Sequence, residues 1–125
     1  MGCPVNPIEG IGDGQFCNKI AQLSHLEYHD FDLAVLLDTD TIFIADPRPH
    51  LDPNRIQAKI VDFANPSIDA LNEIVRVAGL RPPSRQVCND SGEAYMYPAN
   101  RNGGFYSVPR RFVRTMEREW RRWTL

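Results

Sequence analysis

The alternation of apolar and polar residues predicts a helix followed by a strand in the first third of the chain. Between Phe16 and Leu26, apolar side chains recur at helical spacing with polar residues between them, which is the pattern of an amphipathic helix. A strand is predicted next, over Phe31 to Leu37, and it contains the uninterrupted apolar run Leu33 to Leu37. Such a run is typical of a strand covered on both faces, as in parallel sheets between helices.

Proline, glycine and capping residues divide the middle of the chain. A short apolar piece, Ile42 to Ala45, is stopped by the proline-containing turn that follows, because proline lacks the donor that a strand ladder requires. Ala58 to Val61 predicts another short strand. Asn65 is then the predicted N-cap of a helix with Pro66 in its first turn, and this helix ends at Gly79. The apolar face predicted for it consists of Ile68, Leu71, Ile74, Val75 and Ala78.

The last third combines a long loop, a strand and a final helix. The loop runs from Arg81 to Arg101 and contains one short apolar piece, Ala94 to Tyr97. A β-prone run, Asn102 to Val108, follows, and Ser107 is the predicted cap of a helix that begins near Pro109. The apolar stripe predicted for this helix consists of Phe112, Val113, Met116, Trp120 and Trp123, which we expect to form core or subunit contacts.

Composition and charge bound the class of protein. The 125 residues, 42% of them hydrophobic and 24% charged, predict an irregular leader over residues 1–15 and a single α/β domain over residues 16–125. A net charge of −2 offers no general attraction to nucleic acid or membrane. Three cysteines without C-x-x-C spacing predict neither a disulfide framework nor a thiolate zinc site. No apolar stretch is long enough to span a bilayer, and we expect a cytoplasmic protein.

The chemistry predicted from the chain centres on Asp38-Thr39-Asp40, directly after the apolar run. Ligands of open α/β sheets bind beyond the carboxyl ends of the strands. Two carboxylates in a buried position there would repel each other unless a cation lay between them. Mg²⁺ and Mn²⁺ prefer oxygen ligands and often bind through carboxylates together with substrate phosphates. The alternative is a solvated turn whose Asp and Thr side chains satisfy local backbone groups.

The order of two motifs resembles a known family. Leu36-Leu37-Asp38-Thr39-Asp40-Thr41, followed downstream by Asn102-Gly103-Gly104-Phe105, is similar to the nucleotide-sugar glycosyltransferases of the GT-A fold. The resemblance implies a partial GT-A-like, Rossmann-like mixed sheet flanked by helices. It also implies transfer of a sugar from a nucleoside-diphosphate sugar to an acceptor hydroxyl with Mn²⁺ or Mg²⁺ as cofactor.

The resemblance assigns roles to individual residues. Asp40 would be a direct metal ligand, and Asp38 would contact the donor sugar or ribose, or the metal through water. Asn102, Gly103 and Gly104 would shape the sugar and acceptor pocket. Beyond the resemblance, Lys19 is a candidate to meet phosphate. Asp90 and Glu93 are candidates by location for the carboxylate base that an inverting enzyme needs.

The resemblance also implies that part of the fold lies outside this sequence. The strand and helix units that bind the nucleoside in that family would precede the predicted first helix, where the chain has only the irregular leader. A chain of this kind would need an oligomer or partner to cover an open sheet edge. Two alternatives remain: a catalytically inactive interaction domain that uses the arginine-rich last helix, and a haloacid-dehalogenase-type phosphatase with Asp38 as nucleophile and Asp40 as general acid/base.

Overall fold

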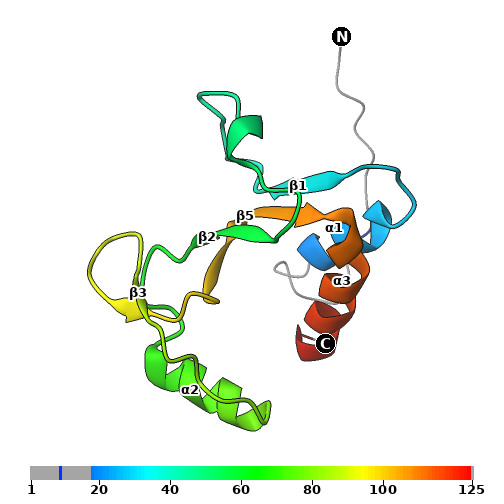
Figure 1. Ribbon diagram of the computed structural model, residues 1–125. Coiled ribbons are helices and arrows are strands. Elements are labelled where there is room, and N and C mark those ends of the chain that lie inside the picture. The colour runs from blue at the N-terminus through cyan, green and yellow to red at the C-terminus, as the bar shows by residue number, and fades with distance from the viewer. Residues whose placement is uncertain (1–8, 10–17, 125) are drawn as a thin grey trace. The chain divides into compact units, whose positions relative to one another are not determined.

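The protein contains both helices and strands in this computed structural model, which describes residue 9 and residues 18–124 (Figure 1). The expectation of an α/β protein is confirmed at this level. The chain divides into two compact units. We call residues 1–57 with 106–125 the α1–α3 unit, and residues 58–105 the α2 unit. None of the helices formed by these described residues combines the length and apolar character that a membrane crossing requires.

The α1–α3 unit contains helix α1 (Asn18–Leu26), strand β1 (Leu33–Leu37), the short 3-10 helix η2 (Arg48–His50) and helix α3 (Arg110–Thr124). Its hydrophobic core is a cluster of four buried side chains: Leu23 of α1, Leu36 of β1, Val113 of α3, and Val108 in the strand that precedes α3. Partly buried side chains surround this cluster: Leu26, Phe31, Tyr106, Phe112, Met116 and Trp120. The helix and strand predicted for this segment are therefore confirmed, although Phe16 lies outside the described residues.

The prediction that β1 is covered on both faces is wrong. Ala34 and Leu36 are buried, whereas Leu33, Val35 and Leu37, which point to the other face, are only half-buried. Leu36 packs with Leu23 of α1 and Val113 of α3, so these two helices cover the face of β1 that carries Ala34 and Leu36. Strand β1 lies at one end of a three-stranded sheet with the order β1-β5-β2. Strand β5 (Arg101–Pro109) is the middle strand of that sheet and contributes residues to both units.

The start and end of α3 differ from the prediction. Ser107 does not cap this helix, because β5 continues through Pro109 and α3 begins at Arg110. The Ser107 side chain is instead fully buried, and its hydroxyl has no hydrogen-bond partner among the residues that the structure describes. The apolar stripe is confirmed through Trp120, whose ring lies 5.4 Å from that of Tyr106. Trp123, however, is 56% exposed and lies beyond the core cluster.

The α2 unit contains helix α2 (Ile68–Val77) and an antiparallel pair formed by β3 (Val87–Cys88) and β4 (Tyr95–Met96). Strand β2 (Gln57–Ile60) leads into this unit. The strands predicted at Ala58–Val61 and Ala94–Tyr97 are thus present with slightly different limits. The sequence did not predict β3, which is too short to show a period of its own.

Helix α2 begins later than predicted and ends where predicted. Ser67, in an extended conformation, is the N-cap, and its hydroxyl accepts a hydrogen bond from the Ala70 N–H, so the assignment of Asn65 as cap is wrong. At the other end Gly79 has a φ of +69°. The Gly79 N–H donates to the Arg76 carbonyl and the Leu80 N–H to the Val75 carbonyl, each at 3.0 Å. These two bonds define a Schellman motif.

Two apolar segments singled out from the sequence contain no fully buried residue. No residue of α2 is buried, and Ile74, on the predicted apolar face, is 53% exposed. Ile42 and Ile44 are 83% and 100% exposed in a segment without regular structure. The two segments differ in degree, because the other residues of the predicted α2 face are partly buried and the Tyr97 hydroxyl donates to Asn72 of this helix at 2.5 Å.

Candidate functional site

The Asp38-Thr39-Asp40 segment forms a turn directly after β1. The Thr41 N–H donates a hydrogen bond to the Asp38 carbonyl at 3.1 Å, which closes the turn. Both aspartates are exposed, and the Asp38 side chain retains 53% of its accessible surface. The sequence argument assumed that both carboxylates are buried and need a cation. This premise is wrong, because the chain passes out of the core at the end of β1 and the residues that follow are exposed. The carboxylates are hydrated and accessible to a ligand.

Lys19 is the side chain that the fold brings to this turn. Its ammonium Nζ lies 2.8 Å from Asp38 Oδ1, and its side chain is only 10% exposed. A lysine so nearly enclosed requires a charged partner, because an unpaired ammonium would lose its hydration without compensation. The sequence singled out Lys19 and Asp38 separately, and the structure joins them in one ion pair between the first turn of α1 and the end of β1.

At this turn, the side chains that could act as metal ligands are the two aspartates. Among residue 9 and residues 18–124, no group of three or more His, Cys, Asp or Glu side chains is arranged to hold a metal ion. The exposed Asp40 carboxylate makes no ion pair within that part of the chain. Two carboxylates with water and donor phosphates would still match Mg²⁺, which usually keeps several waters and takes only one or two protein carboxylates.

The remaining predicted site residues belong to the α2 unit, where they form a polar cluster. Lys59 pairs with the Asp62 carboxylate and, at 3.1 Å, with Asp90. The Asn102 amide donates to the other oxygen of Asp62, and its carbonyl accepts from the Gly104 N–H at 2.6 Å. The hydrogen bond from Lys59 lowers the pKa of the Asp62 carboxyl, and the bonds to Asp62 and Asp90 raise the pKa of Lys59.

Asn89 organises the same cluster and was missed by the sequence reasoning. It is 5% exposed, and its side-chain carbonyl accepts from the Glu93 and Ala94 N–H groups at 3.0 and 3.1 Å. Its amide donates to the Asp62 carbonyl at 3.1 Å. The available signal was the turn-forming composition of residues 89–92, since Asn side chains commonly satisfy nearby backbone groups in turns.

Gly103 was expected to permit close approach to the backbone. A Cβ added at this position would meet no atom within 4 Å, and the residue does not adopt a left-handed conformation. The chain itself therefore imposes no requirement for glycine at Gly103. A role for this residue in ligand binding stays a prediction.

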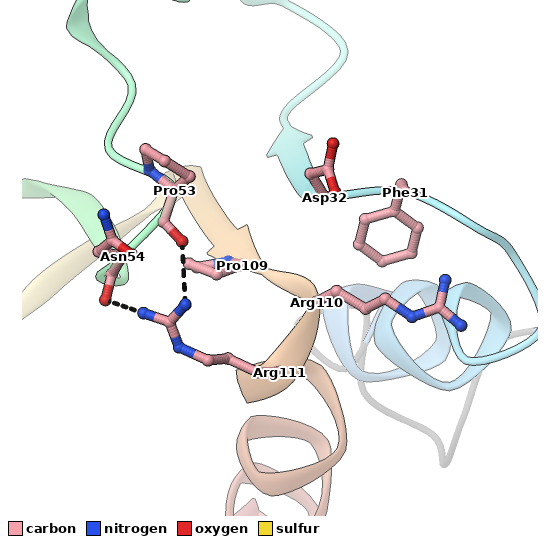
Figure 2. A pocket seen from close by; sticks show the side chains of 7 residues that line it. All are labelled: Phe31, Asp32, Pro53, Asn54, Pro109, Arg110 and Arg111. Carbon is pink, nitrogen blue, oxygen red and sulfur yellow. Dashed lines mark hydrogen bonds between the residues drawn. The ribbon is translucent and has the colours of Figure 1, made fainter.

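A separate pocket of about 630 Å³ lies within the α1–α3 unit (Figure 2). Its lining residues are Phe31, Asp32, Pro53, Asn54, Pro109, Arg110 and Arg111. Figure 2 shows the Arg111 guanidinium directed at the Pro53 and Asn54 carbonyls, to which it donates at 3.4 and 2.5 Å. Asp38 and Asp40 do not line this pocket. Because its guanidinium groups are used in contacts within the chain, we place the candidate site at the exposed turn instead.

Comparison with protein-family models, with curated proteins and with solved structures finds no match to this chain. The functional inference therefore depends on the chain's own residues, above all on Lys19, Asp38 and Asp40.

Proposed function

We propose that this chain is a metal-dependent, glycosyltransferase-like domain that binds a nucleoside-diphosphate sugar at Asp38, Asp40 and Lys19. In this proposal the α/β architecture is GT-A-like, and the sugar is transferred to an acceptor hydroxyl. The single observation that supports it best is the joining of a nearly enclosed lysine to an exposed D-x-D turn, with 2.8 Å between Lys19 Nζ and Asp38 Oδ1.

The charges at the turn suit a metal–diphosphate ligand. Asp38 and Asp40 offer hard oxygen donors of the type that Mg²⁺ and Mn²⁺ prefer. Lys19 adds a fixed positive charge beside them, and an ammonium group is a common partner of phosphate oxygens. The two carboxylates can bind the metal ion, and the lysine ammonium can bind the diphosphate that the metal ion also contacts. The site therefore offers a partner for each part of a metal–diphosphate ligand.

The chain's residues would act chiefly by binding and orientation. When bound, the metal would supply Lewis-acid stabilisation of the charge that develops on the diphosphate leaving group. Asp38 and Asp40 would fix the position of the donor, and Lys19 would hold the Asp38 carboxylate in one orientation. Asp90 is already engaged by Lys59, and the proposal assigns it no part.

Calorimetric titration with UDP and GDP, with and without Mn²⁺, tests the proposal. We expect metal-dependent binding by the unaltered chain and its loss in Asp40→Asn. The matched control is Asp46→Asn, which removes another exposed aspartate of the same unit, one that pairs with Arg48. The proposal fails if the folded chain binds neither nucleotide in the presence of Mn²⁺, or if both variants bind equally well.

A non-catalytic interaction domain is the second candidate. The observation that favours it is the run of exposed apolar side chains from Ile42 to Ile44. The arginines of α3, by contrast, give it little support, because acidic side chains neutralise most of them. The pairs are Arg110–Asp30, Arg114–Glu27, Arg118–Glu119, Arg121–Glu117 and Arg122–Glu119. An acidic partner would have to compete with these internal contacts.

A further inference from the structure

His25 and His29 bring two imidazole nitrogens together at the end of α1. His25 lies in the last turn of the helix and His29 in the turn that follows. Their Nε2 atoms are 3.1 Å apart, and their ring centroids are 4.8 Å apart. Although His29 lies three residues beyond the last residue of α1, the turn after the helix places its ring next to that of His25. This arrangement is independent of the aspartate turn discussed above.

The distance between these nitrogens permits two chemical states. If one imidazole carries its proton on Nε2, it donates a hydrogen bond to the other ring. If both carry their protons on Nδ1, both Nε2 lone pairs are free to bind a single metal ion. With metal–nitrogen bonds of about 2.0–2.1 Å, a separation of 3.1 Å corresponds to a ligand–metal–ligand angle of about 98°. This angle lies between the roughly 90° of square-planar or octahedral sites and the roughly 109° of tetrahedral ones.

We propose that His25 and His29 form a two-histidine binding site for a borderline transition-metal ion such as Zn²⁺ or Ni²⁺. Imidazole nitrogen suits these ions, whereas Mg²⁺ and Mn²⁺ favour oxygen donors. Within the described part of the chain, no third His, Cys, Asp or Glu completes the site. Water therefore fills the remaining coordination positions, and the site is open on its solvent side.

Backbone hydrogen bonds extend the chain beyond α1 as a turn that carries the histidine pair. The Tyr28 N–H donates to the His25 carbonyl at 3.3 Å, and the His29 N–H donates to the Leu26 carbonyl at 3.1 Å. These bonds continue the turn beyond the end of α1. The His29 carbonyl in turn accepts a hydrogen bond from the Arg110 guanidinium at 2.6 Å, and that guanidinium is paired with Asp30. Positive charge at a helix C-terminus interacts favourably with the terminal carbonyl dipoles. A metal bridging both rings would also fasten this last turn.

The histidine site is separate from the proposed donor site, although both use α1. Lys19 and His25 stand near opposite ends of the helix, about 9 Å apart along its axis at the usual rise per residue. The ligand types differ as well, since one site offers carboxylate oxygens and the other imidazole nitrogens. Loss of either site therefore leaves the other in place.

Calorimetric titration with Zn²⁺ tests the histidine site directly. We expect His25→Asn and His29→Asn each to weaken binding by at least about tenfold, because loss of a direct ligand exceeds the ~10–100-fold effect of losing an outer-sphere partner. His50→Asn is the matched control, since His50 is an exposed histidine without a neighbouring ring. Cys88→Ser tests whether the exposed thiol of Cys88 binds Zn²⁺. We expect the Zn²⁺ affinity of this variant to equal that of the unaltered chain.

A second measurement separates the site from a structural role of the two rings. Because a ligand that binds only the folded state stabilises it, Zn²⁺ should raise the thermal midpoint of the unaltered chain but not that of His25→Asn. Circular dichroism without metal confirms that the variants fold. Asp40→Asn should keep its Zn²⁺ affinity even where it loses Mn²⁺-dependent nucleotide binding. Equal Zn²⁺ affinity in the unaltered chain and both histidine variants, or no Zn²⁺ binding by the folded chain, would overturn the proposal.

Discussion

Lys19 Nζ lies 2.8 Å from Asp38 Oδ1, so the first turn of α1 is joined to the residue that follows β1 by a charged hydrogen bond. The two partners differ in their access to water, with side chains 10% and 53% exposed. The lysine has already lost most of its hydration, and the aspartate keeps about half. The pair therefore fixes the orientation of one carboxylate while leaving that carboxylate open to a ligand.

Replacing Lys19 by Met should weaken nucleotide binding while changing the stability of the fold only a little. Met fills much of the volume of the enclosed lysine stem and removes a partly desolvated charge, so we expect the free energy of unfolding to change by less than about 1 kcal/mol. Binding of UDP or GDP with Mn²⁺ should weaken by about tenfold, because the charge beside Asp38 is lost. Urea denaturation and calorimetry measure the two effects.

The control for this change is Lys59→Met. Lys59 also pairs with aspartates, but it is more exposed and belongs to the α2 unit. We expect nucleotide affinity to stay unchanged in this variant. Equal loss of affinity in both lysine variants would show that overall charge, and not the contact between Lys19 and Asp38, accounts for binding.

Glu117 should make the stability of the α1–α3 unit dependent on pH. Burial raises the pKa of its carboxyl, but hydrogen bonds from Arg121 and Ser24 outweigh burial and lower the pKa below 4.5. The Ser24 hydroxyl, on α1, donates to Glu117 of α3 at 2.9 Å. Since the folded pKa is depressed, the contribution of Glu117 to stability is present above the unfolded value. It is lost as the pH falls through the folded value.

We therefore expect Glu117→Gln to lower the free energy of unfolding by about 1 kcal/mol at neutral pH. The difference from the unaltered chain should shrink as the pH falls from about 4.5, where the unfolded carboxyl is half-protonated, through the lower pKa of the folded carboxyl. Denaturation curves over a series of pH values give this difference. A difference that stays constant down to strongly acidic pH would contradict the assignment.

Trp120 and Trp123 should differ in their effect on stability despite their shared place in the predicted stripe. Trp120 packs against the core cluster and against the Tyr106 ring, so Trp120→Ala should cost about 2–3 kcal/mol, somewhat less than for a fully buried tryptophan. Trp123 is 56% exposed, and Trp123→Ala should cost less than about 0.5 kcal/mol. Urea denaturation of both variants checks the contrast. Similar losses of stability in the two variants would show that Trp123 is buried to the same extent as Trp120.

Gly79 and Gly103 should respond in opposite ways to replacement by Ala. Gly79 adopts a φ of +69° at the end of α2, where a Cβ is strained, so Gly79→Ala should cost about 1–2 kcal/mol. Gly103 has neither a left-handed conformation nor an atom within 4 Å of an added Cβ, and Gly103→Ala should change stability by less than about 0.5 kcal/mol. If Gly103→Ala weakens nucleotide binding without affecting stability, the loss of affinity must come from contact between the added methyl group and the ligand.

Much of the local structure could be predicted from the sequence. The helix near residue 20, the strand before Asp38, the end of α2 at Gly79 and the stripe of α3 through Trp120 were predicted and are present. Each depends on side-chain periodicity or a glycine within a few residues of the element it defines. The predictions for Asn65 and Ser107 were wrong about which residue caps a helix. The position of a cap depends on the backbone conformation of the neighbouring residues, which the sequence pattern does not show.

The sequence by itself determined the order of the three α-helices and of the strands other than β3, and it placed two acidic residues after β1, because these features depend on neighbours along the chain. Only the tertiary structure decided that Asp38 is exposed, that Lys19 pairs with it and that Asp90 and Asn102 instead join Lys59 and Asp62 in a cluster of their own. Burial and pairing between distant residues depend on which elements pack together. The periodicity of a single segment does not show which other element the segment packs against.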